Sequence, residues 1–210
     1  MDDRPEIFVG IPCYNTGEKL LVTLQSLQQQ RFKSFKAIIA VEPSKDSQRT
    51  LEIAHYIAKQ DHRFQVKINN TRLGWAGNIQ QLMKDVDCPY FTILPHDDLL
   101  HEDHLYALHK AITENPKVIV AFPNLYFFGA CDGIQEGPSL QGSLAERLIN
   151  HFTAGESSEF WRGLTRSNIL DDKNIIPVCE LNSFAAEYEW AVMLLANGPT
   201  LRVNEAFFYK

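Results

Sequence analysis

The sequence lacks the motifs that mark zinc-binding, redox, membrane-spanning and secreted proteins. Its four cysteines lie far apart and form no C-x-x-C pair, which argues against a zinc knuckle or a redox dithiol and favours buried thiols. No apolar run approaches the roughly 20 residues that a membrane-spanning helix needs. The acidic N-terminal segment MDDRPEIFVG does not resemble a signal peptide. We therefore expect a cytoplasmic protein.

Positive charge is also scarce. Lysine and arginine number 20 against 26 acidic residues, which gives a formal net charge of −6, and neither sign is gathered into long blocks. This balance argues against a nucleic-acid partner. The 210 residues, 45% of them hydrophobic, suffice for one domain with a proper core but are too few for two. We expect a single domain over residues 1–210.

Apolar runs of strand length alternate with segments of helical periodicity over the first 120 residues. The runs predict strands at residues 7–12, 35–41, 64–68, 90–94 and 118–122. The segments between them predict helices at about residues 15–30, 46–60, 75–86 and 102–114, the first capped by Asn15 with Glu18. This order is typical of an α/β fold with a mostly parallel sheet and helices on both faces.

The second half of the sequence has a different pattern of glycines and apolar runs. Residues 128–177 are rich in glycine and poor in long apolar runs, so we expect irregular structure there, with one short helix at about residues 143–152. Long irregular segments of this kind often bind substrates. A last helix at about residues 186–196 is apolar almost all round, which indicates burial on several sides.

Ligand-type side chains follow several of the predicted strands. Asp97 and Asp98 come after the fourth strand in ILPHDDLLHEDHL, Tyr14 follows the first strand, and Glu42 follows the second. In parallel sheets, ligands bind outside the carboxyl ends of the strands. The paired aspartates suit a divalent cation, or they cap the helix that starts near residue 102.

The neighbouring histidines offer a different interpretation. His101 and His104, with the aspartates, could form the cluster of a zinc hydrolase. H-x-x-H alone is unspecific, and we expect His104 to flank the apolar stripe of its helix instead. His96 is the histidine that we expect at the site.

Four stretches, in order, resemble the family 2 glycosyltransferases with the GT-A fold. They are VGIPCYNTGEKLLVTLQSL, VEPSKD, NNTRLGWAGNIQQL with YFTILPHDDLLHEDHL, and AAEYEWAVMLLANGPTLRVNEAFFYK, and together they cover nearly the whole chain. The resemblance implies an inverting transfer of a sugar from a nucleotide-diphosphate sugar to an acceptor hydroxyl. It also implies Mg²⁺ or Mn²⁺ on the diphosphate, and a glycan or lipid-linked acceptor in surface-polysaccharide or cell-envelope synthesis. On this reading residues 1–127 bind the nucleotide sugar and residues 128–210 form the acceptor side, with peripheral association at the inner face of the membrane as one option.

The resemblance also implies roles for single residues on the donor side. Asp98 would hold the metal and Asp97 the ribose hydroxyls, while Glu42 would accept hydrogen bonds from the base. Pro12, Tyr14 and Asn78 match further positions of the nucleotide pocket.

Two departures qualify the resemblance. Pro95 stands where many members have the first aspartate, and Gly77 stands where related sequences often carry arginine. Both favour the alternative that the chain is a catalytically silent nucleotide-sugar-binding module. Phe160, Trp161 and Arg162 could form a sugar platform or could simply be packed.

The catalytic base falls in the last helix. Glu187 falls at the position of the aspartate that acts as the catalytic base in the resembling family, and Glu189 is the alternative. Residues two positions apart on a helix point about 200° away from each other, so Glu187 and Glu189 cannot both face the donor. We choose Glu187. The chain stops at Lys210, whereas the family continues with a basic residue and a histidine, which predicts a truncated domain or a shortened member.

Overall fold

The computed structural model describes residues 4–129, 132–153, 159–171 and 186–210. Within this part of the chain one nine-stranded sheet has the order β3-β2-β1-β4-β8-β6-β9-β5, and β7 pairs with β6. The strands of the first half are β1 (Ile7–Cys13), β2 (Phe35–Val41), β3 (Phe64–Ile68), β4 (Tyr90–Ile93) and β5 (Leu99–Leu100). β1 pairs in parallel with β2 and β4, and β2 with β3. The α/β class with a mostly parallel sheet is thereby confirmed.

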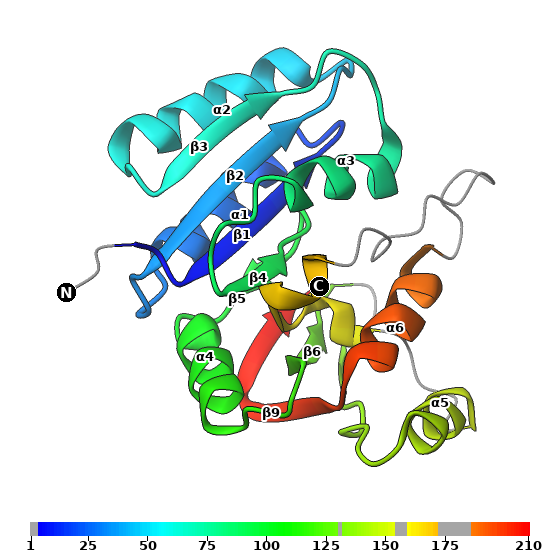
Figure 1. The fold of residues 1–210 in the computed structure, drawn as a ribbon. Coiled ribbons are helices and arrows are strands. Elements are labelled where there is room, and N and C mark those ends of the chain that lie inside the picture. The colour runs from blue at the N-terminus through cyan, green and yellow to red at the C-terminus, as the bar shows by residue number, and fades with distance from the viewer. Residues whose placement is uncertain (1–3, 130–131, 154–158, 172–185) are drawn as a thin grey trace.

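The second half continues the same sheet. Its strands are β6 (Val120–Phe127), β7 (Gly133–Gln135), β8 (Leu164–Arg166) and β9 (Thr200–Tyr209). β8 joins the halves, since it pairs antiparallel with both β4 and β6. β9 runs parallel to β6, and its end pairs with β5. The end of the described chain therefore returns to the loop that follows β4 (Figure 1).

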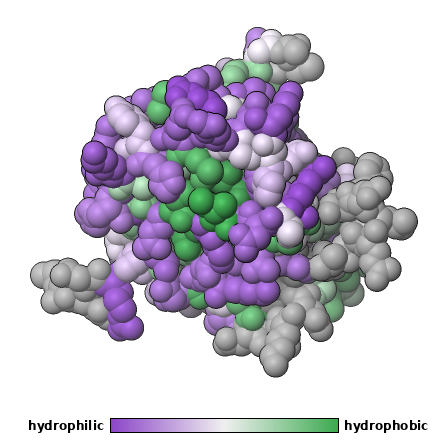
Figure 2. Space-filling model, turned by 90° about the horizontal axis from the view of Figure 1, so that it is seen from above, coloured by the Kyte–Doolittle hydropathy of each residue, from purple (hydrophilic) through white to green (hydrophobic). Residues whose placement is uncertain are grey.

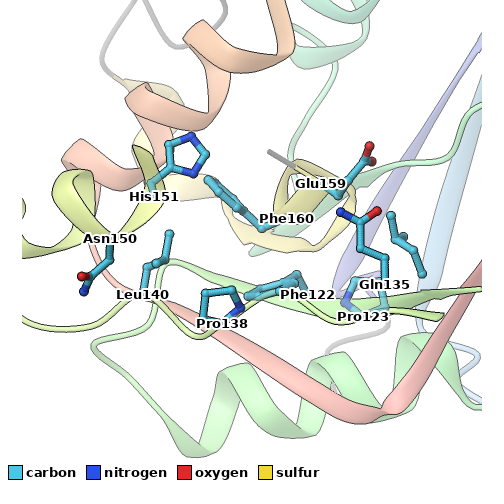
Figure 3. A pocket seen from close by; sticks show the side chains of 11 residues that line it. Phe122, Pro123, Gln135, Pro138, Leu140, Asn150, His151, Glu159 and Phe160 are labelled. Carbon is cyan, nitrogen blue, oxygen red and sulfur yellow. The ribbon is translucent and has the colours of Figure 1, made fainter. Parts of the chain in front are cut away.

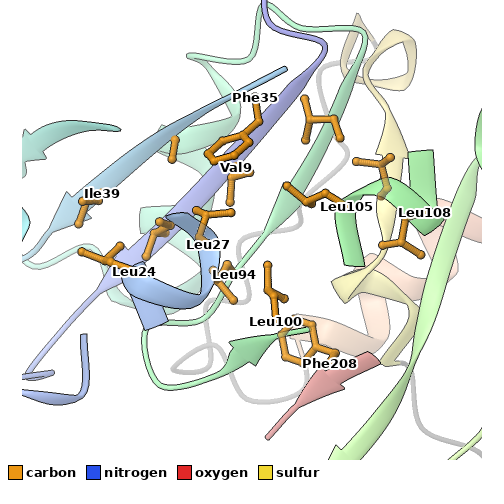
Figure 4. Close-up of a cluster of buried hydrophobic side chains, with 14 of the residues drawn as sticks. Val9, Leu24, Leu27, Phe35, Ile39, Leu94, Leu100, Leu105, Leu108 and Phe208 are labelled. Carbon is orange, nitrogen blue, oxygen red and sulfur yellow. The ribbon is translucent and has the colours of Figure 1, made fainter. Parts of the chain in front are cut away.

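Helices cover both faces of the sheet because the strand residues alternate between two cores. The helices are α1 (Lys19–Gln28), α2 (Ser47–Gln60), α3 (Gly74–Met83), α4 (His104–Glu114), α5 (Leu144–Thr153) and α6 (Ala186–Asn197), with 3₁₀ turns η1 (Glu159–Arg162) and η2 (Ser167–Asp171). Val9 and Ile39 pack with α1, α2 and α4 in one core (Figure 4). Phe8 and Ile38 pack with α3, η1 and α6 in the other. None of the described helices is long and apolar enough to cross a membrane.

The surface seen from above is mostly hydrophilic, around one central hydrophobic area (Figure 2).

The two cysteines in the described ranges, Cys13 and Cys88, are both buried, as predicted. Burial raises the pKa of the Cys88 thiol to about 12. Cys131 and Cys179 lie outside the described residues.

Two local predictions are wrong. Asn15 does not cap the first helix, and it has a φ of 55°. Glu18 takes the N-cap position without a side-chain cap bond, and its carboxylate pairs with Arg49. The segment 128–177 is also more regular than expected, since α5 is accompanied by β7, η1, β8 and η2. A strand as short as β8 leaves no readable periodicity, and its conformation is set by pairing with β4 and β6. The part of this segment at residues 130–131, 154–158 and 172–177 lies outside the described residues.

Candidate active site

A cleft of about 810 Å³ opens where β1 and β4 end. Its lining comes from α1, the loop after β4, η1, α3, α6 and the ends of β6 and β9: Pro12, Lys19, Val22, Thr23, Trp75, Pro95, His96, Asp97, Asp98, Leu99, Phe128, Glu159, Trp161, Arg162, Glu187 and Lys210. Ring nitrogen Nδ1 of His96 lies 3.0 Å from the Pro12 carbonyl oxygen. The Thr23 hydroxyl donates to the His96 carbonyl at 2.9 Å. The loop carrying the aspartates is thus tied to β1 and α1, and His96 lies at the site as predicted.

The two aspartates differ in their surroundings. Asp97 is exposed in the cleft, whereas Asp98 is 4% exposed. Burial raises the pKa of Asp98 to about 6 despite the attraction of the Arg162 guanidinium, whose Nε lies 3.5 Å from Asp98 Oδ2. Neither aspartate caps a helix, because α4 begins at His104 directly after Asp103.

Arg162 connects Asp98 to the end of β9. Its guanidinium pairs with Glu159 and lies 4.2 Å from the centre of the Trp161 ring. Glu159 Oε1 is in turn 3.5 Å from Lys210 Nζ. Burial lowers the pKa of Arg162, and burial together with Arg162 lowers the pKa of Lys210. Asp98, Arg162, Glu159 and Lys210 therefore form a chain of alternating charge along one wall of the cleft.

Sequence reasoning missed most of this wall. It considered Arg162 only as part of an aromatic platform, and it gave no role to Glu159, Lys210, Lys19 or Trp75. The i,i+3 spacing of Glu159 and Arg162 was a usable signal, since such a spacing brings two side chains together on a helical turn. Lys210 had no local signal, because the return of β9 to the cleft depends on its pairing with β6 and β5.

Three of the expected nucleotide-pocket residues do not line the cleft. Tyr14 is 37% exposed, and the Arg72 guanidinium lies 4.2 Å from its ring centre. Glu42 is 2% exposed, and its Oε1 accepts the Leu73 N–H at 2.7 Å. Asn78 is also buried: it donates to the Ala40 carbonyl and accepts from Asn69. Glu42 and Asn78 therefore hold α3 against the strand ends in this structure.

The two glutamates of the last helix are separated as the helical geometry predicts. Glu187 lies in the first turn of α6, is partly buried and lines the cleft. Glu189 is exposed and is not among the lining residues. Of the two, Glu187 is the carboxylate that faces the space above Asp97 and Asp98.

The histidine cluster of a zinc hydrolase is not assembled. His104 is buried with Nδ1 3.0 Å from the Phe207 carbonyl oxygen, and burial lowers its pKa to about 4. His101 Nδ1 accepts the Asp103 N–H at 3.3 Å, and His101 is not among the residues that line the cleft. Across the described residues no group of three or more His, Cys, Asp or Glu side chains could hold a metal ion.

The aspartates nevertheless suit one divalent cation that is shared with a substrate. Among the described residues, buried Oδ2 of Asp98 has no hydrogen-bond partner, and Asp97 stands beside it in the cleft. Mg²⁺ and similar hard cations are commonly bound by one or two carboxylates, with waters and substrate phosphates completing the shell. A protein cage of three ligands is therefore not required.

Figure 3 shows a second, smaller pocket and the side chains that line it. It has a volume of about 20 Å³ and lies between β6, α5 and η1, with Phe122, Leu140, His151 and Phe160 among its lining. This volume holds about one water molecule. Glu159 lines both this pocket and the cleft, and of these two the cleft is the one with room for a substrate.

Comparison with known proteins gives one family. The model of "Glycosyl transferase family 2" matches residues 8–167. The chain is 30% identical over 97 residues to the amylovoran biosynthesis glycosyltransferase AmsB of Erwinia amylovora, which is 46% of this chain and 32% of AmsB. It is 26% identical over 197 residues to glycosyltransferase GlyA of Streptococcus pneumoniae, which is 93% of this chain and 25% of GlyA. The chain thus spans about a quarter to a third of the length of these relatives.

Solved structures share the fold. The structure of S. aureus TarS 1-349 aligns with a TM-score of 0.79 at 19% identity, over 97% of this chain and 60% of that one. The mannosyltransferase PcManGT of Pyrobaculum calidifontis, solved with GDP-Man and Mn²⁺, aligns with a TM-score of 0.70 at 13% identity, over 99% of this chain and 57% of that one. At such identities the likeness concerns the fold, and it confirms the expected GT-A type. The match of the family model over residues 8–167 shows that this chain belongs to glycosyl transferase family 2.

Proposed function

We propose that this chain is the catalytic domain of an inverting glycosyltransferase that moves a sugar from a nucleotide-diphosphate sugar to an acceptor hydroxyl. The observation that carries the proposal is the cleft, in which Asp97 and Asp98 after β4 meet Glu187 from α6. Displacement with inversion needs both charge stabilisation at the leaving diphosphate and a separate carboxylate for the acceptor proton. The cleft contains groups for both tasks.

The donor end of the site would be built on the aspartates. Asp98 would hold a divalent cation, Mg²⁺ or Mn²⁺, and such a cation would neutralise the leaving diphosphate. Asp97 would accept hydrogen bonds from the ribose hydroxyls. Pro12 would line the nucleotide pocket, with Tyr14 at its outer end and Glu42 and Asn78 fixing the start of α3 behind it.

Glu187 would act as the general base. Its carboxylate would take the proton from the acceptor hydroxyl as that oxygen attacks the anomeric carbon from the face opposite the diphosphate. Lys19, Arg162 and Lys210 also line the cleft, where Glu159 pairs with both Arg162 and Lys210. These three cations would lie near the phosphates of the donor.

The pathway is proposed from the relatives. AmsB is named for amylovoran biosynthesis, and one TarS structure contains UDP-GlcNAc. The name of AmsB supports a role in surface-polysaccharide or cell-envelope synthesis, with a glycan or lipid-linked acceptor. The TarS complex supports a nucleotide-sugar donor. A location at the inner face of the membrane stays a prediction.

One rival function has a specific observation in its favour. At Gly77, where related sequences often carry arginine, an added Cβ would lie 2.9 Å from the Leu73 Cβ, so a larger side chain there requires Leu73 to shift. A silent nucleotide-sugar-binding module would lack both the arginine at position 77 and the aspartate at the position of Pro95.

One experiment separates the candidates. The protein is incubated with UDP- and GDP-sugars and Mn²⁺, and both the thermal shift and the release of free nucleoside diphosphate are followed. Stabilisation with release supports the transferase, and stabilisation without release supports the silent module. If no nucleotide sugar has any effect, both nucleotide functions are wrong.

A further inference from the structure

All three tryptophans of the chain lie together at the wall of the cleft. Trp75 comes from α3, Trp161 from η1 and Trp190 from α6. Ring centroids are 5.5 Å apart for Trp75 and Trp161, 6.3 Å for Trp75 and Trp190, and 5.3 Å for Trp161 and Trp190. Three distant segments therefore bring their largest side chains to one place.

Trp75 and Trp161 both line the cleft, and Trp75 is the more exposed of the two. Trp161 is 4% exposed and Trp190 is fully buried. Trp75 is partly exposed and lines the cleft. The sequence left two alternatives open for Phe160, Trp161 and Arg162, a sugar platform or simple packing. All three are buried, and the more accessible ring is that of Trp75.

The position of Trp75 is fixed before any ligand arrives. Gly74 has a φ of 73°, which glycine adopts without strain, and this turn starts α3. The turn is held from behind by the carboxylate of Glu42, which accepts the Leu73 N–H. Edge-to-face contacts with two other tryptophans then hold the ring itself. An ordered ring loses little conformational entropy on binding.

The cluster is coupled to the proposed catalytic base. Trp190 follows Glu187 by three residues on α6, so the two lie on neighbouring positions of one helix face. Trp75, Glu187 and Asp97 all line the same cleft. An apolar aromatic surface with carboxylates at its rim suits a ligand that has a C–H face and hydroxyl edges.

We propose that Trp75, supported by Trp161 and Trp190, is a platform on which a pyranose ring stacks beside Glu187. The ring belongs either to the sugar of the donor or to a sugar of the acceptor. The inference rests on the proposed function, because that function places the reacting sugar next to Glu187.

The test compares Trp75→Leu, which keeps an apolar side chain but removes the aromatic face, with Trp75→Phe, which restores an aromatic face. Tyr56→Leu is the matched control, since Tyr56 is an exposed aromatic residue on α2 that does not line the cleft. Calorimetric titration of each variant uses UDP, GDP, UDP-GlcNAc and GDP-mannose with Mn²⁺. Separate titrations use methyl glycosides of N-acetylglucosamine and mannose. Circular dichroism verifies that each variant is folded. In the wild type, tryptophan fluorescence gives a second signal, because every tryptophan of the chain is in the cluster.

The two sources of the sugar give different results. If the donor sugar stacks on Trp75, Trp75→Leu weakens binding of the nucleotide sugar roughly three- to tenfold, the scale of one aromatic contact, and leaves binding of the nucleoside diphosphate unchanged. If an acceptor sugar stacks there, the same loss appears with a methyl glycoside. In both cases Trp75→Phe recovers most of the affinity and Tyr56→Leu has no effect.

The remaining results overturn one or both proposals. Equal affinities of wild type and Trp75→Leu for every sugar ligand overturn the platform while the proposed function stands. Binding of methyl glycosides that depends on Trp75, without any binding of nucleotides, keeps the platform and refutes the proposed function. If the wild type binds neither class of ligand, both are wrong.

Discussion

The buried carboxyl of Asp98 should make the protein less stable at neutral pH than a variant that cannot ionise there. Burial raises the pKa of this group from 3.8 to about 6 in the folded chain. Below pH 3.8 the carboxyl is protonated in both the folded and the unfolded state, so its burial adds no ionisation cost to the free energy of folding. As pH rises through 6, the folded state must ionise a side chain that is 4% exposed. The stability that the protonated carboxyl contributes at acid pH is then lost. Each tenfold change in a protonation equilibrium is about 1.4 kcal/mol, so the full loss is on the order of 3 kcal/mol.

The variant that tests this is Asp98→Asn. Urea unfolding in EDTA between pH 4 and pH 8 should show the stability of Asp98→Asn rising relative to wild type by about 1–3 kcal/mol. Asp61→Asn is a control of opposite sign, because a hydrogen bond from Arg63 lowers the pKa of Asp61. That variant should lose stability relative to wild type as pH rises from acid to neutral. If Asp98→Asn behaves like Asp61→Asn, the reasoning about the buried carboxyl fails.

The same variant also tests function. Asp98→Asn should lose Mn²⁺-dependent binding of nucleoside diphosphates although it is the more stable protein at pH 7. Stability given up at a functional site is a common trade-off. Full retention of metal-dependent binding would exclude Asp98 as the metal ligand.

Three further outcomes are expected. Glu187→Gln should cut sugar transfer roughly 100-fold or more while nucleotide binding persists, and Glu189→Gln should do little; the reverse pattern in a transfer assay would mean that the base is misassigned. Arg162→Met leaves the buried carboxylate of Asp98 without its ion-pair partner and should lower the melting temperature by roughly 10 °C. Arg31→Met, whose side chain is 62% exposed, should change it far less. Gly163→Ala would place a Cβ 2.4 Å from the Ala121 carbonyl oxygen and should destabilise by about 2 kcal/mol or more in urea unfolding, while Gly133→Ala, with open space around it, should be neutral.

The first half of the fold could be predicted from the sequence because its information is local. The strands Phe35–Val41 and Phe64–Ile68 coincide with their apolar runs, and α6 lies where the apolar helix was expected. Hydrophobic periodicity marks such elements without reference to the rest of the chain. The motifs at the strand ends, together with the resemblance to the family, then indicated Asp97, Asp98 and Glu187, and all three line one cleft.

The roles of other residues were decided only by tertiary contacts. Glu42 follows a strand in sequence like a ligand-binding carboxylate, yet in space it is buried beneath Leu73 and holds the turn before α3. Trp75, Arg162 and Lys210 reach the cleft because α3, η1 and β9 pack against β1, β4 and β6. A side chain's exposure and partners depend on residues far away in the chain. Composition and spacing therefore determined which reactive side chains were available, and the packing of the two halves on one sheet determined which of those side chains face the cleft.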